Sequence, residues 1–497
     1  MALMAEVPSK VGTSICSEDG AVKDGGDDTC ECVGPVCASD PLVYKLYHLQ
    51  IMKFDDRQLA APWKREMDRV SNLVNLRHLH LYSGIIPMIP CVGKLTSLHE
   101  LYGFCIKQQD GYTTGELKNL MNIHHLYVSG LDKVLEIESM PRCLEWVGLE
   151  GKNVFPRLEM LKVRDCDALR TLPSVPTSIR HVEIHKAETL WQGCSLSALE
   201  ELSIQQCPSL SCLPKDSFGS LASLKTFKVV KCPNLRTGEI RLPPTVKYIT
   251  LGLCGEAEQP LVHSLKGLDS LVVLFLDGCA LSLFPSEVFT CLAGLTIMVF
   301  GNCAITSLPL AEAFATLTNL ENLSIWDCQE LVSINGILGS PSLLSLQIEG
   351  CNKITADQWV DDAASFSSLY ELDIDNPLLL LSEPLQSISC VKKLIIAGGP
   401  ELRYLPEDWL LQNEALKELK VSDASHLICL PPQMTSLSSV ELFDISNAKL
   451  IQSLPDMPAS LRSLRINDCH SELKKRCQKN KGLDWDKIAH ICNIDIS

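Results

Sequence analysis

A short apolar pattern recurs along nearly the whole chain, and it constrains the fold more than any other feature. It reads L-x-x-L-x-[L/I/V]-x-x-C, with apolar replacements at the leucine positions and other residues at some cysteine positions. Clear copies are Leu199-Leu202-Ile204-Cys207 and Leu320-Leu323-Ile325-Cys328. Eighteen copies, spaced about 24 residues apart on average, begin at residues 46, 76, 98, 123, 158, 179, 199, 224, 246, 271, 295, 320, 343, 369, 391, 416, 440 and 461. Because one such unit cannot bury its own apolar face, the units must stack side by side.

Each copy predicts a short strand followed by a turn towards the core. The L-x-L part alternates apolar and polar residues, which indicates a strand with one face inward. A second apolar pair often ends in Leu-Pro, as at Leu172-Pro173 and Leu213-Pro214, where proline stops the strand. Residues 286–295 and 310–320 are predicted to form short helices. The expected fold is an α/β leucine-rich-repeat solenoid, a horseshoe with a parallel concave sheet and short helices or irregular segments on the convex side.

The pattern divides the chain into three parts. Residues 1–41 precede the repeats and carry eight acidic residues against two lysines, so we predict an acidic, disordered segment. Residues 42–470 are predicted to form one domain of about 18 repeats, with roughly 16 to 19 parallel strands. The step of 35 residues between the copies at 123 and 158 is anomalous, and Leu144-Val147-Leu149 is a candidate degenerate copy within it. Residues 471–497 are predicted to form a helical cap over the last repeat.

Cysteine content and charge narrow the class of protein. Nine of the 23 cysteines occupy the last position of the repeat, where a buried thiol acts as a small hydrophobe. We therefore expect reduced thiols and no disulfide framework. A net charge of −16 disfavours a nucleic-acid partner, which requires clustered Lys and Arg. Residues 1–10 lack the features of a signal peptide, and no run of about 18 apolar residues occurs, so we expect no membrane span and a cytoplasmic or nucleo-cytoplasmic location.

Two groups of cysteine and histidine residues are candidate zinc ligands. The spacing of Cys30, Cys32 and Cys37, with Cys16 upstream, matches no common zinc finger. The second group lies in the tail and consists of Cys469, His470, Cys477, His490 and Cys492. Because Cys469 already holds a repeat position and residues 471–481 indicate a polar helix, a structural cap explains this group better. We expect no metal and no cofactor, and the absence of G-x-S-x-G and H-E-x-x-H motifs argues against an enzyme.

Several longer stretches carry a resemblance to one family. They are Lys45-Leu46-Tyr47-His48-Leu49-Gln50 with Asn75-Leu76-Arg77-His78-Leu79, Val92-Gly93-Lys94-Leu95-Thr96-Ser97-Leu98-His99-Glu100-Leu101, Phe155-Pro156-Arg157-Leu158-Glu159 leading to Val163-Arg164-Asp165-Cys166, and Glu472-Leu473, Arg476-Cys477, Gly482 and Asp484-Trp485-Asp486-Lys487-Ile488-Ala489-His490-Ile491. The chain resembles the repeat region of plant intracellular nucleotide-binding leucine-rich-repeat (NB-LRR) disease resistance proteins of the cereal type. The resemblance implies recognition of a pathogen effector or of a guarded host protein in plant defence.

The phosphate-binding loop of that family is missing from this sequence. The G-x-x-x-x-G-K-[ST] motif supplies backbone amides that surround phosphate. Here Gly-Lys occurs at Gly93-Lys94 and Gly151-Lys152, where Met88 and Trp146 stand five residues before each glycine. Leu95 and Asn153 follow the two lysines. The chain is therefore expected to bind no nucleotide and to resemble such a receptor without its nucleotide-binding domain.

The x positions of the strands face solvent on the predicted concave sheet, and most are polar. The copies at 246, 271, 295 and 320 break this rule, and exposed apolar patches usually mark contact surfaces. The predicted partner-binding residues are Tyr248, Val273, Phe275, Ile297, Val299 and Trp326, continued by the acidic Glu349, Glu371, Asp373 and Asp375. Coverage by a loop of the chain itself is the alternative for this patch. An adaptor or substrate receptor of a ubiquitin ligase is the alternative function, although residues 1–41 show no F-box-like helical pattern.

Overall fold

The computed structural model describes residues 31–32, 50–54, 67–81, 89–106, 109–130, 133–146, 157–170, 176–187, 196–213, 218–354, 368–381, 385–398 and 402–497. Two compact units divide the chain, which we call unit 1 (Met1–Ser223) and unit 2 (Leu224–Ser497). The boundary falls between the repeats that begin at 199 and 224. Within each unit every described strand pair is parallel, so the predicted parallel solenoid is confirmed.

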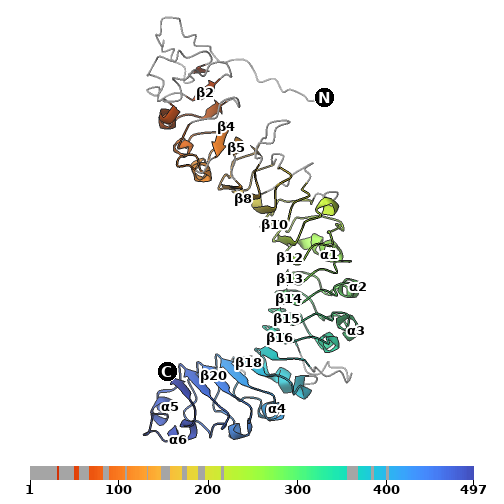
Figure 1. Ribbon diagram of the computed structural model, residues 1–497, viewed down its shortest axis with the longest axis vertical. Coiled ribbons are helices and arrows are strands. Elements are labelled where there is room, and N and C mark those ends of the chain that lie inside the picture. Colours follow the sequence, from red (N-terminus) through yellow and green to blue (C-terminus); the bar gives the residue numbers. More distant parts are fainter. Residues whose placement is uncertain are drawn as a thin grey trace. The chain divides into compact units, whose positions relative to one another are not determined.

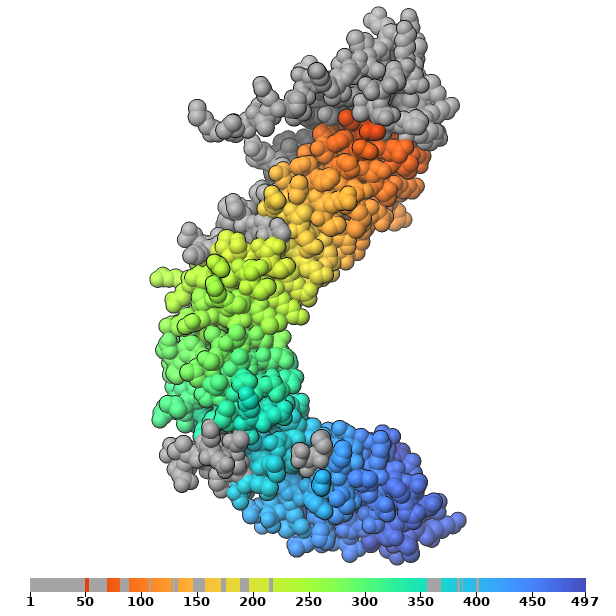
Figure 2. All heavy atoms as spheres, turned by 180° about the vertical axis from the view of Figure 1, so that it is seen from behind, coloured from red at the N-terminus to blue at the C-terminus, as the bar shows by residue number. Residues whose placement is uncertain are grey.

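In unit 2 each repeat contributes one strand and the tail adds a last one, and each strand pairs with the next along the chain. The strands are β11 (Thr226–Val230), β12 (Tyr248–Gly252), β13 (Val273–Asp277), β14 (Ile297–Gly301), β15 (Asn322–Trp326), β16 (Ser345–Glu349), β17 (Glu371–Ile374), β18 (Lys393–Ala397), β19 (Glu418–Ser422), β20 (Leu442–Ser446), β21 (Ser463–Asn467) and β22 (Asn493–Ile496). Successive repeats follow one another in chain order from green to blue in Figure 2.

Unit 1 contains strands of two sheets. The first sheet has the order β1 (Glu31–Cys32), β2 (Ile51–Phe54), β3 (His78–Leu81), β4 (Glu100–Ile106), β5 (His125–Gly130) and β7 (Glu145–Trp146). The second has the order β6 (Val134–Glu138), β8 (Met160–Cys166), β9 (His181–Ala187) and β10 (Glu201–Gln205). The chain changes sheets within the long step between the copies at 123 and 158, where both β6 and β7 form. The described strands between residues 42 and 470 therefore number 20, one above the predicted range, and our count was too low.

Short helices connect the strands. The α-helices are α1 (Glu258–His263), α2 (Ser286–Phe289), α3 (Ala311–Phe314), α4 (Glu407–Gln412), α5 (Ser471–Arg476) and α6 (Trp485–Ile488). The 3-10 helices are η3 (Met67–Asn72), η4 (Val92–Lys94), η5 (Thr114–Asn119), η6 (Phe218–Ser220), η7 (Gly255–Ala257), η8 (Asn335–Gly339), η10 (Pro377–Leu381), η11 (Leu385–Ser387) and η12 (Met434–Ser436). In unit 2, α1, α2 and α3 lie on the side opposite the strands (Figure 1). Helices α2 and α3 lie within the two segments predicted to be helical, 286–295 and 310–320, but each has only four residues.

The cysteine position closes each strand and turns the chain into the core. The preceding residue often has a positive φ, as at Asn302 (49°) and Asp327 (54°), a conformation that Asn and Asp tolerate better than most residues. The following thiols are buried, and Cys303 Sγ lies 3.2 Å from the carbonyl oxygen of Gly301. All cysteines that the structure describes with their side chains are free thiols. The buried thiols at the repeat position fill the layers between repeats, as the sequence predicts.

The tail closes the last repeat of unit 2. Helices α5 and α6 are followed by β22, a strand that the sequence did not predict and that pairs with β21. Asp484 is fully buried between them, 2.7 Å from Arg476 Nε and 2.9 Å from Lys487 Nζ. Its Oδ2 also accepts a hydrogen bond from the backbone of Leu454, in the preceding repeat. These contacts of Asp484 hold the tail on the final repeat.

Candidate functional site

The open face of the sheet is where the side chains not needed for packing gather. In β13 the inward Leu274 and Leu276 are buried, whereas Val273 and Phe275, which alternate with them, are half-buried. Parallel pairing aligns equivalent positions, so Val273 lies beside Tyr248 and Ile297 on the neighbouring strands. The outward register that the sequence predicts is thus present in these strands. What binds this face stays a prediction.

Six side chains form what we call the apolar patch of unit 2. They are Tyr248, Val273, Phe275, Ile297, Val299 and Trp326. Tyr248 is 46% exposed and Ile297 is 36% exposed, while the other four are half-buried on the same face. Register places Tyr248, Val273 and Ile297 in one column and Phe275 and Val299 in a second. The patch therefore runs across four consecutive strands, β12 to β15.

Trp326 extends the patch because its neighbour on β14 is a glycine. Gly301 lies beside Trp326 in the register, and a Cβ added to Gly301 would lie 2.2 Å from Cζ2 of the indole. The ring therefore occupies the space that a side chain at 301 would fill. It also meets Phe275, with ring centroids 6.3 Å apart and planes inclined by 55°. The two aromatic rings are thus held in place before any partner arrives.

The four acidic residues beside the patch are not equivalent. Glu371 is paired with Lys393, with Oε1 and Nζ 2.7 Å apart. Asp375 accepts a hydrogen bond from the backbone of Gly350. By contrast, Asp373 Oδ1 is buried and has no hydrogen-bond partner among the described residues. Burial, together with the charges of Glu349 and Glu371, raises the pKa of Asp373 to about 6.

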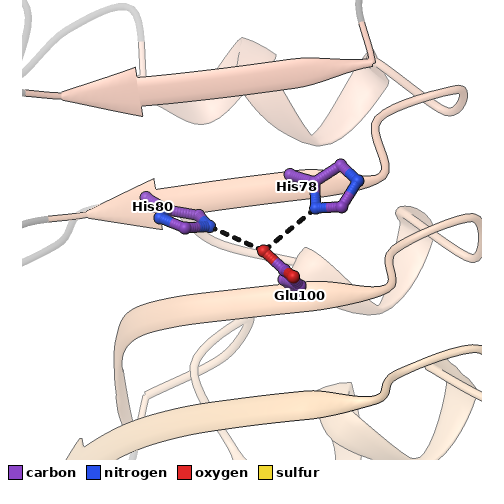
Figure 3. Close-up of side chains that lie close together, drawn as sticks. All are labelled: His78, His80 and Glu100. Carbon is purple, nitrogen blue, oxygen red and sulfur yellow. Dashed lines mark hydrogen bonds and ion pairs between the residues drawn. The ribbon is translucent and has the colours of Figure 1, made fainter. Parts of the chain in front are cut away.

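The open face of unit 1 carries a different set of side chains, which sequence reasoning missed. His78 and His80 project from β3 towards Glu100 on β4 (Figure 3). His78 Nδ1 and His80 Nε2 each lie 3.0 Å from Glu100 Oε2. Burial opposes ionisation of Glu100, but hydrogen bonds with the two histidines lower the pKa of its carboxyl overall. A His-x-His pair in a predicted strand, with Glu at the position of His78 in the next repeat, was the available signal.

The candidate zinc ligands from the sequence do not come together in the described part of the chain. There, one group of three or more His, Cys, Asp or Glu side chains brings its ligand atoms within 4.8 Å, and it is the His78, His80 and Glu100 group. In the tail, His470 caps α5 by accepting from the backbone of Glu472. His490 Nε2 lies 2.8 Å from the carbonyl oxygen of Pro458. Of the other candidate group, Cys32 lies in strand β1, and Cys30 and Cys37 lie outside the described residues.

The repeat pattern and the parallel strand order define this chain as a leucine-rich-repeat α/β solenoid. Its curated relatives are plant disease resistance proteins. The TMV resistance protein N of Nicotiana glutinosa is 25% identical over 290 residues, covering 48% of this chain and 25% of that protein. In Arabidopsis thaliana, the disease resistance-like protein DSC1 is 24% identical over 86% of this chain, and disease resistance protein RPS4B is 22% identical over 82%. This chain covers 30% and 26% of their lengths, respectively.

The predicted resemblance to plant NB-LRR disease resistance proteins is confirmed, whereas its cereal type stays a prediction. No family model matches the chain. Among solved structures, a leucine-rich-repeat protein of Leptospira interrogans has a TM-score of 0.38 at 16% identity, covering 88% of this chain and 98% of that one. The Drosophila Toll receptor in its complex with Spätzle gives 0.41 at 12% identity, covering 79% and 53%. Among the described residues, no helix has the length and hydropathy needed to cross a bilayer.

Proposed function

We propose that this chain is a recognition module of plant defence that binds a protein partner on the open face of unit 2. The partner would be a pathogen effector or a guarded host protein. The observation that carries the proposal is the apolar patch, because aromatic and aliphatic side chains there are aligned on a face where most repeats carry polar ones. The similarity to plant disease resistance proteins supports the defence role.

The acidic side of the patch favours a partner with a basic surface. Among the described residues Asp373 Oδ1 has no hydrogen-bond partner, whereas Lys393 forms its ion pair with the neighbouring Glu371. A lysine or arginine from a partner would supply the missing counter-charge and hydrogen bond at Oδ1. Complementary charge also speeds association and discriminates against acidic partners. The chain would therefore anchor a partner through Trp326 and Phe275 and orient it through Asp373.

The same proposal includes what the chain does not do. We propose a cytoplasmic, non-enzymatic protein that recognises its partner without nucleotide, nucleic acid or cofactor. The free thiols of the repeat positions suit a reducing compartment. A ubiquitin-ligase adaptor remains the alternative, and a pull-down with scaffold subunits of such ligases separates the two. Capture of a scaffold subunit that does not depend on Trp326 would favour the adaptor.

The test removes one anchor at a time. Trp326→Ala and Phe275→Ala should each weaken partner binding by roughly 2 kcal/mol, about 30-fold in dissociation constant. Proteins from infected plant tissue that the wild-type chain captures and the two variants do not would identify the partner. The affinities of the wild type and of each variant are then measured with the purified partner. Leu310→Ala is the matched control, because Leu310 is 73% exposed but precedes α3 on the helix side. Equal affinities for the wild-type chain and both aromatic variants would disprove the proposed site.

Thermal melting completes the test. Both variants should melt close to the wild type, because the two side chains lie outside the buried layers. A fall of several degrees would instead make the residue part of the core. In that case loss of binding would follow from loss of structure, and the assignment of the patch would fail.

A further inference from the structure

Two histidines and one glutamate meet at a single point on the open face of unit 1, outside the proposed partner site. His78 and His80 occupy alternate positions of β3, so their side chains share one face of the strand. Glu100 is the residue of β4 that pairs with His78. One carboxylate oxygen, Glu100 Oε2, lies 3.0 Å from a nitrogen of each imidazole. Figure 3 shows both rings directed at this oxygen from one strand.

Compared with other strand-face acids, Glu100 has an unusual set of partners. Elsewhere on these faces, Glu136 and Glu183 pair with Arg164, and Glu371 pairs with Lys393. The ion pairs of Glu100 among the described residues are both with histidine. A single histidine is enough to satisfy a glutamate at the equivalent pair of His181 and Glu201, 3.1 Å apart. Two neutral imidazoles and one carboxylate form a donor set typical of transition-metal sites.

We infer that His78, His80 and Glu100 bind a Zn²⁺ ion. Zinc ligated at about 2.0–2.1 Å in tetrahedral geometry separates its ligand atoms by roughly 3.3 Å, close to the two nitrogen–oxygen distances of 3.0 Å. The three ligand atoms all lie within 4.8 Å of one another, so small side-chain rotations complete the arrangement. Two nitrogen donors favour Zn²⁺ over Mg²⁺ and Ca²⁺, which prefer oxygen ligands.

The strands hold these ligands in place before a metal binds. Leu79 lies between the two histidines and Leu101 follows Glu100, and both are fully buried. β3 is flanked by β2 and β4, and β4 by β3 and β5, which fixes the register of all three ligands. The ligand side chains are 24–31% exposed, so an ion can reach them from solvent. Three protein ligands leave the fourth tetrahedral position open to water or to a side chain of another molecule.

To test the site, the full chain is stripped of metal and titrated with Zn²⁺ alone under reducing conditions. Calorimetry measures the binding. His80→Gln and Glu100→Gln each remove one ligand and should weaken this binding step at least about 10-fold, since even outer-shell changes cost that much. His181→Gln is the matched control, because it alters a strand-face histidine–glutamate pair that has no second histidine. It should leave the affinity unchanged. Circular dichroism of the metal-free variants checks that each one folds like the wild type.

Co²⁺ provides a readout that does not depend on affinity. The wild type should give weak visible bands typical of nitrogen and oxygen ligands, and these bands should disappear in His80→Gln and Glu100→Gln. Exposed thiols such as Cys212 and Cys429 would instead give intense near-ultraviolet thiolate bands. Thiolate bands alone, unchanged Zn²⁺ binding in both variants, or no binding by the wild type would each overturn the site. None of these outcomes bears on the apolar patch of unit 2.

Discussion

The open faces of the two units use the same repeat in different ways. On the open face of unit 1 charged side chains pair with one another, as Arg164 does with Glu136 and Glu183. In unit 2 the strands β12 to β15 present apolar side chains, and Asp373 on β17 lacks a partner among the described residues. The inward positions of both units carry the same buried leucines and isoleucines. The repeat pattern therefore determines the inward residues of each strand and leaves the open-face residues free to differ.

This difference shows where free energy for binding is available. An ion pair that is already formed within the chain has little to gain from a partner, and at the surface it contributes little stability. An exposed aromatic ring or an unpartnered carboxylate gains most when another molecule covers it. The open face of unit 2 is thus the better candidate for a protein interface, whereas the face of unit 1 suits a small ion.

The largest effect on stability should come from truncating a buried side chain, and truncating its open-face neighbour in the sequence should have a much smaller effect. Phe300 is fully buried, with its ring 6.1 Å from that of Phe284, whereas Val299 lies on the open face. Phe300→Ala should lower the free energy of unfolding by about 3–5 kcal/mol, and Val299→Ala by less than about 1 kcal/mol. Urea unfolding followed by circular dichroism measures both. Similar losses for the two variants would mean that the open face is covered by the chain itself.

A smaller effect with an informative sign is expected at Asp373. Its pKa in the folded chain, about 6, lies above the ordinary value of 3.8. The stability that this group contributes is therefore present at low pH and is lost as the pH rises through about 6. Asp373→Asn should stabilise the chain at about pH 7.5 by at most about 1 kcal/mol, since solvent screens a half-exposed carboxylate, and the gain should shrink towards pH 4.

The same variant should weaken binding of a basic partner, which separates a functional residue from a structural one. Glu371→Gln is the matched control, because it loses an existing pair with Lys393 and should not stabilise the chain. Thermal melting against pH, together with affinity for the identified partner, measures both effects. If Asp373→Asn were neutral in stability at every pH, the acid would already have a counter-charge, and its role in orienting a partner would be lost.

The smallest effect is expected on the open face of unit 1. Arg164→Ala removes a guanidinium that is one-third exposed and lies 3.0 Å from Glu136 and 2.9 Å from Glu183. Because such pairs are screened by solvent, the loss should stay below about 1 kcal/mol and shrink in high salt. Binding at the unit 2 patch should not change. A loss of several kcal/mol would show that these charges hold the repeats together, contrary to the comparison drawn above.

Sequence alone identified 17 of the 18 predicted repeat strands in the correct register, because alternation of apolar residues and a constant step favour the register that buries the leucines. The copy at 46 was placed three residues too early, since Met52, and not Ile51, is buried and pairs with Leu79. The sequence missed β6, since Leu135 and Ile137 come only 12 residues after the copy at 123 and look like the interior of one long repeat. It also missed β22, which has no repeat of its own and is fixed by pairing with β21.

On the open face, the sequence determined which residues point outward but not what they touch. Trp326 lies over Gly301, 25 residues away, and His80 meets Glu100, 20 residues away. These partners depend on side-chain rotamers and on the distance between neighbouring strands, neither of which the repeat pattern encodes. For the acidic residues, the repeat register already places Lys393 beside Glu371. Tertiary structure alone decided that Asp373 Oδ1 is buried without a hydrogen-bond partner among the described residues.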